Sequence, residues 1–359
     1  MEGVSGATDA EVGRLVAGCF WEEGASMSRR VIVIAAAVVL VGACSGGSLK
    51  PFSRTGGGAG VEAAGDSGAK PISSPAPAVP AITRAEALKV LERYVKFDGE
   101  EGKYSRGTAL KLGKATARIR KLKGEARTET KDPTDQRVYI PRRSAKPWFM
   151  GEYRGDGGSY QVQVVFAKQE NDWYAVNTMV VGDKPKVPRV AVDADGYATE
   201  VALGDGDGLA MSPAGMADLH LAYLASQGRS GGESLVPGFY TTSRVRGLKA
   251  SEKQAAHHWK YEPSYRRDGA VYALRTGSGG ALVWYAHMLS MKITVLYLDY
   301  QVEPTTTNLV TLARGRKYQR YMAFRELGGY MAYVPPAGSP PKPARVMGGW
   351  EEFLDLKGT

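Results

Sequence analysis

The chain has 359 residues, enough for about two folded domains, and its 43% hydrophobic and 23% charged residues are typical of globular proteins, which excludes a disordered or fibrous chain. Its formal net charge is +10 at pH 7. Only two cysteines are present, Cys19 and Cys44, and this excludes a disulfide-stapled scaffold and a four-cysteine zinc site.

A hydrophobic segment near the N-terminus predicts export. Arg29 and Arg30 precede thirteen uncharged residues at 31–43. These are too few for a membrane-spanning helix, which needs about 20 residues, but they fit the hydrophobic region of a signal peptide. A membrane anchor or a buried strand is the alternative interpretation of the same segment.

The segment ends in a four-residue pattern that resembles the lipobox of bacterial lipoproteins, Val41-Gly42-Ala43-Cys44. The resemblance implies cleavage between Ala43 and Cys44 and acylation of the Cys44 thiol. We therefore expect a location on the extracytoplasmic face of the cell membrane, with the lipid as anchor. The mature chain would then carry 44 basic and 32 acidic residues and would have no second cysteine as a disulfide partner.

The requirement for an apolar segment before the lipobox also predicts where translation starts. Residues 16–19 also spell a lipobox, but no apolar run precedes them. We therefore interpret Met27 as the initiator, residues 1–26 as a non-native extension and residues 27–43 as the signal peptide. Residues 44–81 form a lipidated tether, since Gly, Ser, Ala and Pro make up 26 of the 37 residues at 45–81.

The first folded unit is expected at 82–184. Thr83 and Glu86 form a capping box that starts a helix, and Gly99 can end it. Strand-like runs follow at 148–154, 159–167 and 172–181, separated by short turns.

The second unit is expected at 185–340, followed by a C-terminal tail at 341–359. Residues 190–201 predict a hairpin, and Ser212 caps a helix that Gly228 ends. Further strands are expected at 270–275, 281–289, 291–300, 318–327 and 330–334.

The order of elements predicts an α+β protein with two tandem domains, each a curved antiparallel sheet packed on a helix, behind the disordered tether. This order is similar to that of the nuclear transport factor two-like fold. Over residues 27–340, the lipobox, tether and tandem layout together resemble secreted actinobacterial lipoproteins of uncharacterised function. Neither resemblance carries site residues.

Histidine spacing does not indicate a metal site. No two of the four histidines have the spacing that puts two ligands on one helix face, and we expect His220 to be half-buried on its helix. We also find no catalytic triad pattern, no dinucleotide fingerprint and no cofactor motif. The four are His220, His257, His258 and His287.

The basic segment at 103–146 is the clearest functional signal, with fourteen Lys and Arg against four acidic residues. An exported protein does not meet nucleic acid, so anionic lipid head groups or wall polymers are the expected partners. A solvated surface of a basic protein is the alternative. The candidate contact residues are Arg118, Arg120, Lys121, Lys123, Arg142 and Arg143.

These observations predict a cell-surface lipoprotein of binding or scaffolding type. The alternative is an extracytoplasmic hydrolase-type enzyme whose dispersed active site lies in one of the cone-like cavities. A cluster of titratable side chains inside a pocket would favour the enzyme.

Overall fold

The computed structural model describes residues 80–97, 102–126, 133–155, 160–182, 186–204, 206, 208–255, 257–338 and 342–359. The predicted extension, signal peptide, lipobox (with Ala43 and Cys44) and all but the end of the tether therefore lie outside the described residues. Among the described residues, no helix has both the length and the apolar composition that crossing a membrane requires.

The N-terminal part of the fold begins with the predicted capping box. The backbone N–H of Thr83 donates to Glu86 Oε2 at 2.9 Å, and the Glu86 N–H donates to Thr83 Oγ1 at 3.3 Å. Because both side chains satisfy free N–H groups, the helix starts here. The elements are α2 (Arg84–Phe97), α3 (Gly107–Lys123), β1 (Thr134–Tyr139), β2 (Trp148–Gly155), β3 (Tyr160–Gln169) and β4 (Asp172–Val181).

The C-terminal part begins with a second predicted cap. Ser212 Oγ accepts a hydrogen bond from the Gly215 N–H at 3.1 Å, and Pro213 occupies the first turn, where no N–H is needed. The elements are α4 (Pro213–Ala225), η2 (Gly232–Ser234), η3 (Phe239–Ser243), α5 (Arg244–Ala255), β5 (Trp259–Arg267), β6 (Tyr272–Arg275), β7 (Ala281–Val295), α6 (Thr307–Ala313), β8 (Tyr321–Val334) and β9 (Arg345–Gly358).

The nine strands of the described residues belong to one antiparallel sheet, in the order β1-β2-β3-β4-β9-β8-β7-β5, with β6 paired to β7. The β4–β9 junction is a single pair, Val181 with Gly348. The α+β class is therefore confirmed. The tandem arrangement of two separate sheets is not confirmed, because the last strand joins both parts.

Three details differ from the sequence-based expectation. The predicted tail at 341–359 is wrong, because β9 pairs with β8 from Tyr333–Arg345 to Met322–Gly358. The strands predicted as 281–289 and 291–300, and as 318–327 and 330–334, are two long strands, β7 and β8, that continue through Ser290 and through Gly328 and Gly329. The basic stretch after Lys103 contains a full helix, α3.

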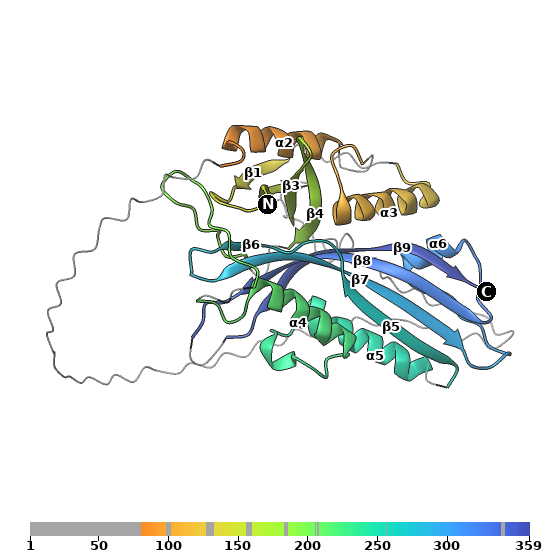
Figure 1. Ribbon diagram of the computed structural model, residues 1–359. Coiled ribbons are helices and arrows are strands. Elements are labelled where there is room, and N and C mark those ends of the chain that lie inside the picture. Colours follow the sequence, from red (N-terminus) through yellow and green to blue (C-terminus); the bar gives the residue numbers. More distant parts are fainter. Residues whose placement is uncertain are drawn as a thin grey trace, which may run out of the picture.

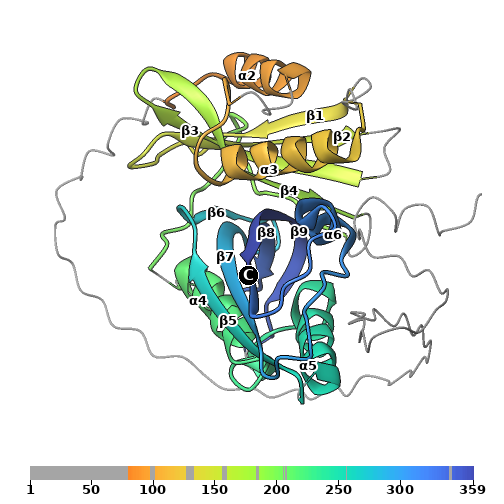
Figure 2. The same cartoon turned by 90° about the vertical axis from the view of Figure 1, so that its right-hand side faces the viewer.

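The sheet bends back on itself, so the molecule has a helix layer, two sheet layers and a second helix layer (Figures 1 and 2). Alternate residues of β2 show how: Phe149 packs with the α2 residue Leu91, whereas Met150 joins Trp284 and Met331 between the sheet layers. The helices α4 and α5 cover the opposite face of the second sheet layer, α4 against β5, β7 and β8 and α5 against β5 (Figure 2).

The helix α3 lies beside β4, over β8 and β9, and next to α6 (Figure 2). Its buried face carries small and aliphatic side chains at helical spacing, and Ile119 packs with Leu309 and Leu312 of α6. At the other end of the helix, Thr108 Oγ1 donates to the buried Asp268 at 2.8 Å. Because both ends are anchored, α3 has a fixed orientation on the molecule.

Candidate functional site

A buried polar network lies between the sheet and the helix layer formed by α4, η3 and α5. His220 of α4 is completely buried, and both of its ring nitrogens are hydrogen-bonded. Its Nε2 donates to the Tyr240 carbonyl at 2.9 Å, and its Nδ1 accepts from the Tyr285 hydroxyl at 2.8 Å. A carbonyl can only accept, so Nε2 carries the proton of the neutral ring and Nδ1 is left as the acceptor. Burial lowers the pKa of His220 to about 4.

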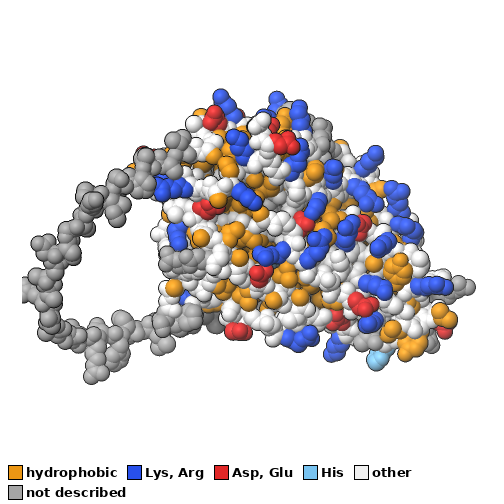
Figure 3. Space-filling model, in the orientation of Figure 1, with side chains coloured by type: hydrophobic (Ala, Val, Ile, Leu, Met, Phe, Trp, Pro, Cys, Tyr) orange, Lys and Arg blue, Asp and Glu red, His pale blue; other side chains and the backbone are white. Residues whose placement is uncertain are grey.

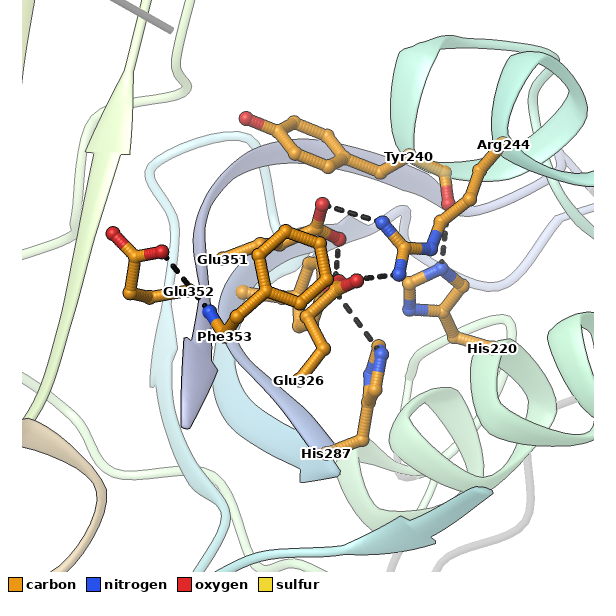
Figure 4. A network of polar contacts seen from close by, with 9 residues as sticks. His220, Tyr240, Arg244, His287, Glu326, Glu351, Glu352 and Phe353 are labelled. Carbon is orange, nitrogen blue, oxygen red and sulfur yellow. Dashed lines mark hydrogen bonds and ion pairs between the residues drawn. The ribbon is translucent and has the colours of Figure 1, made fainter. Parts of the chain in front are cut away.

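Arg244, the first residue of α5, lies between two carboxylates (Figure 4). Its guanidinium contacts Glu351 of β9 at 2.5 Å and Glu326 of β8 through the other terminal nitrogen. About a fifth of the Arg244 side chain remains exposed, against a tenth of Glu326. Burial raises the pKa of Glu326 to about 7, an effect that Arg244 opposes and the Glu351 charge reinforces.

Tyr330 links this ion-pair triad to the second buried histidine. The Tyr330 hydroxyl donates to Glu351 Oε1, so it accepts from His287 Nε2 at 3.1 Å. The two rings stack at 4.4 Å with an angle of 11° between their planes. Burial lowers the pKa of His287 well below its usual range, and that of Tyr330 is raised well above its own. Among the described residues, His287 Nδ1 has no hydrogen-bond partner.

The network can hold or release a proton at Glu326 near neutral pH, because burial raises the pKa of this carboxyl and the Glu351 charge reinforces the effect. Within the described ranges, no three His, Cys, Asp or Glu side chains come together in a way that could bind a metal ion. The contacts of the network run between these side chains and to backbone carbonyls, and Arg244 Nε and His287 Nδ1 have no hydrogen-bond partner among the described residues. Its direct structural effect is to join α4, η3 and α5 to β7, β8 and β9.

The basic residues predicted at 118–123 do lie together, on α3. This helix carries six Lys and Arg and no acidic residue. Lys114, Arg118 and Lys121 are exposed, and none has a carboxylate partner among the residues described here. Arg118 donates to the Leu354 carbonyl at 3.4 Å. We call Lys114, Arg118 and Lys121 the α3 basic face.

The other candidates differ in their surroundings. Arg120 is half-buried, and Lys123 lies 3.9 Å from Glu125. Their charges are therefore less available to a partner than those of the α3 basic face.

Arg142 and Arg143 lie on the segment after β1 rather than on α3. Arg142 contacts Asp193 at 2.6 Å and Asp195 at 2.5 Å, and it lowers the pKa of Asp193 to about 2. Arg143 is exposed and lines, with Arg142, a cleft of about 180 Å³ beside Trp148. Two aspartates therefore compensate the charge of Arg142.

Two features were missed in the sequence. Lys114 belongs to the α3 basic face, which its spacing of four and seven residues from Arg118 and Lys121 could have indicated once a helix was expected. The network around Arg244 has no local signal, because Glu326 and Glu351 lie 82 and 107 residues away. His220 was expected to be half-buried and is instead completely enclosed.

Basic side chains near α6 extend the basic surface. Arg314 and Arg316 are exposed in the turn that ends α6, which packs beside α3. Figure 3 shows Lys and Arg side chains gathered over the region where Figure 1 places α3 and α6.

Comparison with known proteins finds relatives among Streptomyces lipoproteins. An uncharacterised lipoprotein of Streptomyces coelicolor is 28% identical over 58% of this chain and 67% of its own length. One of Streptomyces avermitilis is 27% identical over 58% of this chain and 66% of its own. A second S. coelicolor lipoprotein is 28% identical over 48% and 51%.

No solved structure matches the chain significantly, so the similarity to the nuclear transport factor two-like fold is not confirmed. A domain of unknown function, DUF8094, matches residues 78–358, which include nearly every described residue. The chain therefore belongs to the DUF8094 family.

Proposed function

We propose that the protein is a lipid-anchored cell-surface protein that binds phosphate-bearing anionic components of the envelope through the α3 basic face. The lipobox ending in Cys44 and the lipoprotein names of its relatives support the anchor. The observation that carries the binding is the row of exposed cations on α3, which have no carboxylate partners in the described part of the chain.

The geometry of α3 favours binding to an extended anionic surface. Lys114 and Lys121 are seven residues apart, about 10 Å along the helix axis, and Arg118 lies between them. The opposite face of α3 is buried, so the three charges are held in a fixed row. Each Lys or Arg near an anionic membrane surface contributes about 1 kcal/mol, which makes the row alone worth about 3 kcal/mol at low salt.

The test uses the chain from Ser45, which lacks the lipidated Cys44 but contains every residue that the structure describes. Binding to phosphatidylglycerol-containing vesicles and to soluble poly(glycerol phosphate) is measured for wild type and for a triple variant, Lys114→Glu, Arg118→Glu and Lys121→Glu. We expect wild type to bind both at low salt and to ignore pure phosphatidylcholine vesicles. The variant should lose at least a hundredfold in affinity.

A matched control distinguishes the effect of the α3 basic face on binding from the effect of the protein's net charge. Lys168, Arg229 and Lys249 are also exposed and have no carboxylate partner among the described residues, but they lie outside α3. Reversing these three to Glu changes the net charge by the same amount and should leave most of the binding intact. Equal losses in both triple variants would contradict the proposal, as would a wild-type chain that binds neither partner.

A further inference from the structure

Three large apolar side chains are exposed together in the segment that follows β7. The exposed fractions are 48% for Leu296, 59% for Tyr297 and 94% for Leu298. An apolar group in water is unfavourable, and three consecutive ones on one loop are a feature of contact sites. We call Leu296, Tyr297 and Leu298 the apolar tip.

Hydrogen bonds at the base of the loop hold the apolar tip away from the core. The Leu296 N–H donates to the His258 carbonyl at 2.9 Å, and the Tyr300 N–H donates to the Tyr297 carbonyl at 3.1 Å. The Tyr300 ring stacks on His258 at 4.0 Å. The tip is therefore a supported projection from the ends of β5 and β7.

Three exposed arginines lie on the chain segment that is hydrogen-bonded to this loop region. The Val295 N–H donates to the Arg320 carbonyl at 2.8 Å, which places Arg320 beside the loop, and its side chain is exposed. Tyr318, which pairs with Val302 of the same loop region, directly follows the exposed turn that contains Arg314 and Arg316. None of these three arginines has a carboxylate partner in the described ranges.

Acidic groups near the tip only partly offset this charge. Asp299 is exposed beside Leu298, whereas Glu303 is paired with Lys317 at 2.7 Å. The arginines and the apolar tip lie at the same end of the molecule as the C-terminus, since the Arg320 N–H donates to the Thr359 carbonyl at 2.7 Å (Figure 1).

We propose that the apolar tip inserts into an anionic lipid bilayer and that Arg314, Arg316 and Arg320, beside the tip, contact the lipid head groups. This deepens the proposed function and rests on it, because it names lipid rather than wall polymer as the partner of the basic surface. A poly(phosphate) chain has no apolar interior to receive Leu298, whereas the boundary between head groups and acyl chains accepts Leu and Tyr side chains. The combination of cations and apolar side chains therefore fits a membrane.

The sequence provides a direct probe of insertion. The chain from Ser45 has no cysteine, so Leu298→Cys creates a single labelling site for an environment-sensitive fluorophore such as NBD. Because Leu298 is 94% exposed, the substitution leaves the core intact. We expect a blue shift and a severalfold rise in NBD emission on adding phosphatidylglycerol-containing vesicles, and no change with poly(glycerol phosphate).

Val192→Cys is the matched control. Val192 is 51% exposed, and Val190, two residues before it, pairs with Thr276 near the start of β7. The length of β7, about 50 Å for 15 residues, separates it from the apolar tip. A label at this position should stay in water when the vesicles bind.

A second variant tests how much the apolar tip contributes to vesicle affinity without changing the protein's charge. Leu296→Ser with Leu298→Ser should weaken vesicle binding about tenfold and leave poly(glycerol phosphate) binding unchanged. A label at position 298 that stays in water while vesicles bind would overturn insertion and leave the proposed function standing. If the chain forms a dimer that Leu298→Ser dissociates while vesicle binding is unchanged, the apolar tip is a contact with a second copy of the chain. That result would also overturn insertion. If neither vesicles nor polymer bind, the proposed function itself fails.

Discussion

His220 makes the stability of the protein sensitive to acid in a way that one substitution can reveal. Its ring is completely buried and neutral, with a pKa of about 4 in the folded chain against about 6.5 when unfolded. Below pH 6.5 the unfolded chain binds a proton that the folded chain does not, so this histidine lowers stability as the pH falls. Between pH 7 and pH 5 the loss is about 2 kcal/mol.

Glu326 acts in the opposite direction over the same range. Its pKa of about 7 lies above the unfolded value of 4.5, so the folded chain binds the extra proton and gains stability as the pH falls. The wild-type stability alone therefore does not isolate His220, and a difference between variants is needed.

The assay is urea unfolding of wild type and His220→Gln at pH 7 and pH 5. Gln cannot titrate, so the stability of wild type relative to the variant should be about 2 kcal/mol lower at pH 5 than at pH 7. Replacing the exposed His257 by Gln is the control and should leave the wild-type pH dependence in place. A wild-type-to-variant difference that is the same at both pH values would refute a buried, neutral His220.

Four further substitutions test other parts of the protein. The contribution of Glu326 to wild-type stability should fall as the pH rises from 5 to 8, and Glu326→Gln should abolish this part of the pH dependence. Unfolding curves of the variant that keep the wild-type pH dependence would contradict this. Gly329→Ala should destabilise the protein by at least about 2 kcal/mol, because a Cβ there would lie 2.5 Å from Asn177 Oδ1. Gly247→Ala should stabilise it by up to about 1 kcal/mol, because a Cβ at this helical position would have no atom within 4 Å. Thermal unfolding measures both changes. Cys44→Ala should abolish labelling of the exported protein by a palmitate analogue, and equal labelling would exclude Cys44 as the lipidation site.

Local sequence patterns predicted those elements whose stability is local. The capping box at Thr83 and the N-cap at Ser212 are formed with the expected hydrogen bonds, and β2, β3 and β4 match the predicted runs within a few residues. In each case the cap or the alternation of buried residues is contained in fewer than fifteen residues.

Elements that depend on distant partners were not recognised. The strand β9 contains three glycines and adjacent acidic residues, Glu351 and Glu352, so it has little intrinsic strand preference; its pairing with β8 makes it a strand. Of the five residues that α3 buries, three are small, including Ala109 and Ala115, and only Leu112 and Ile119 are large, so its apolar stripe is weak.

The same limit applies to the candidate sites. The charge count at 103–146 identified the basic region but could not separate Arg142, which two aspartates from another segment compensate, from Arg118, which stays accessible. Nor could spacing reveal that Arg244 meets Glu326 across the sheet. The number of charges in a segment can be counted from the sequence, whereas the availability of each charge to a partner depends on its tertiary contacts.

The salt dependence of vesicle binding tests the central claim most directly. The chain from Ser45 is titrated with phosphatidylglycerol-containing vesicles at salt concentrations between 0.1 M and 1 M, over which the Debye length falls from about 10 Å to about 3 Å. If the α3 basic face makes the contact, wild-type affinity should fall steeply across this range, and the triple variant Lys114→Glu, Arg118→Glu and Lys121→Glu should show weak binding with a much shallower slope. Wild-type affinity that is unchanged by salt, or a triple variant with the wild-type slope, would contradict electrostatic binding through α3.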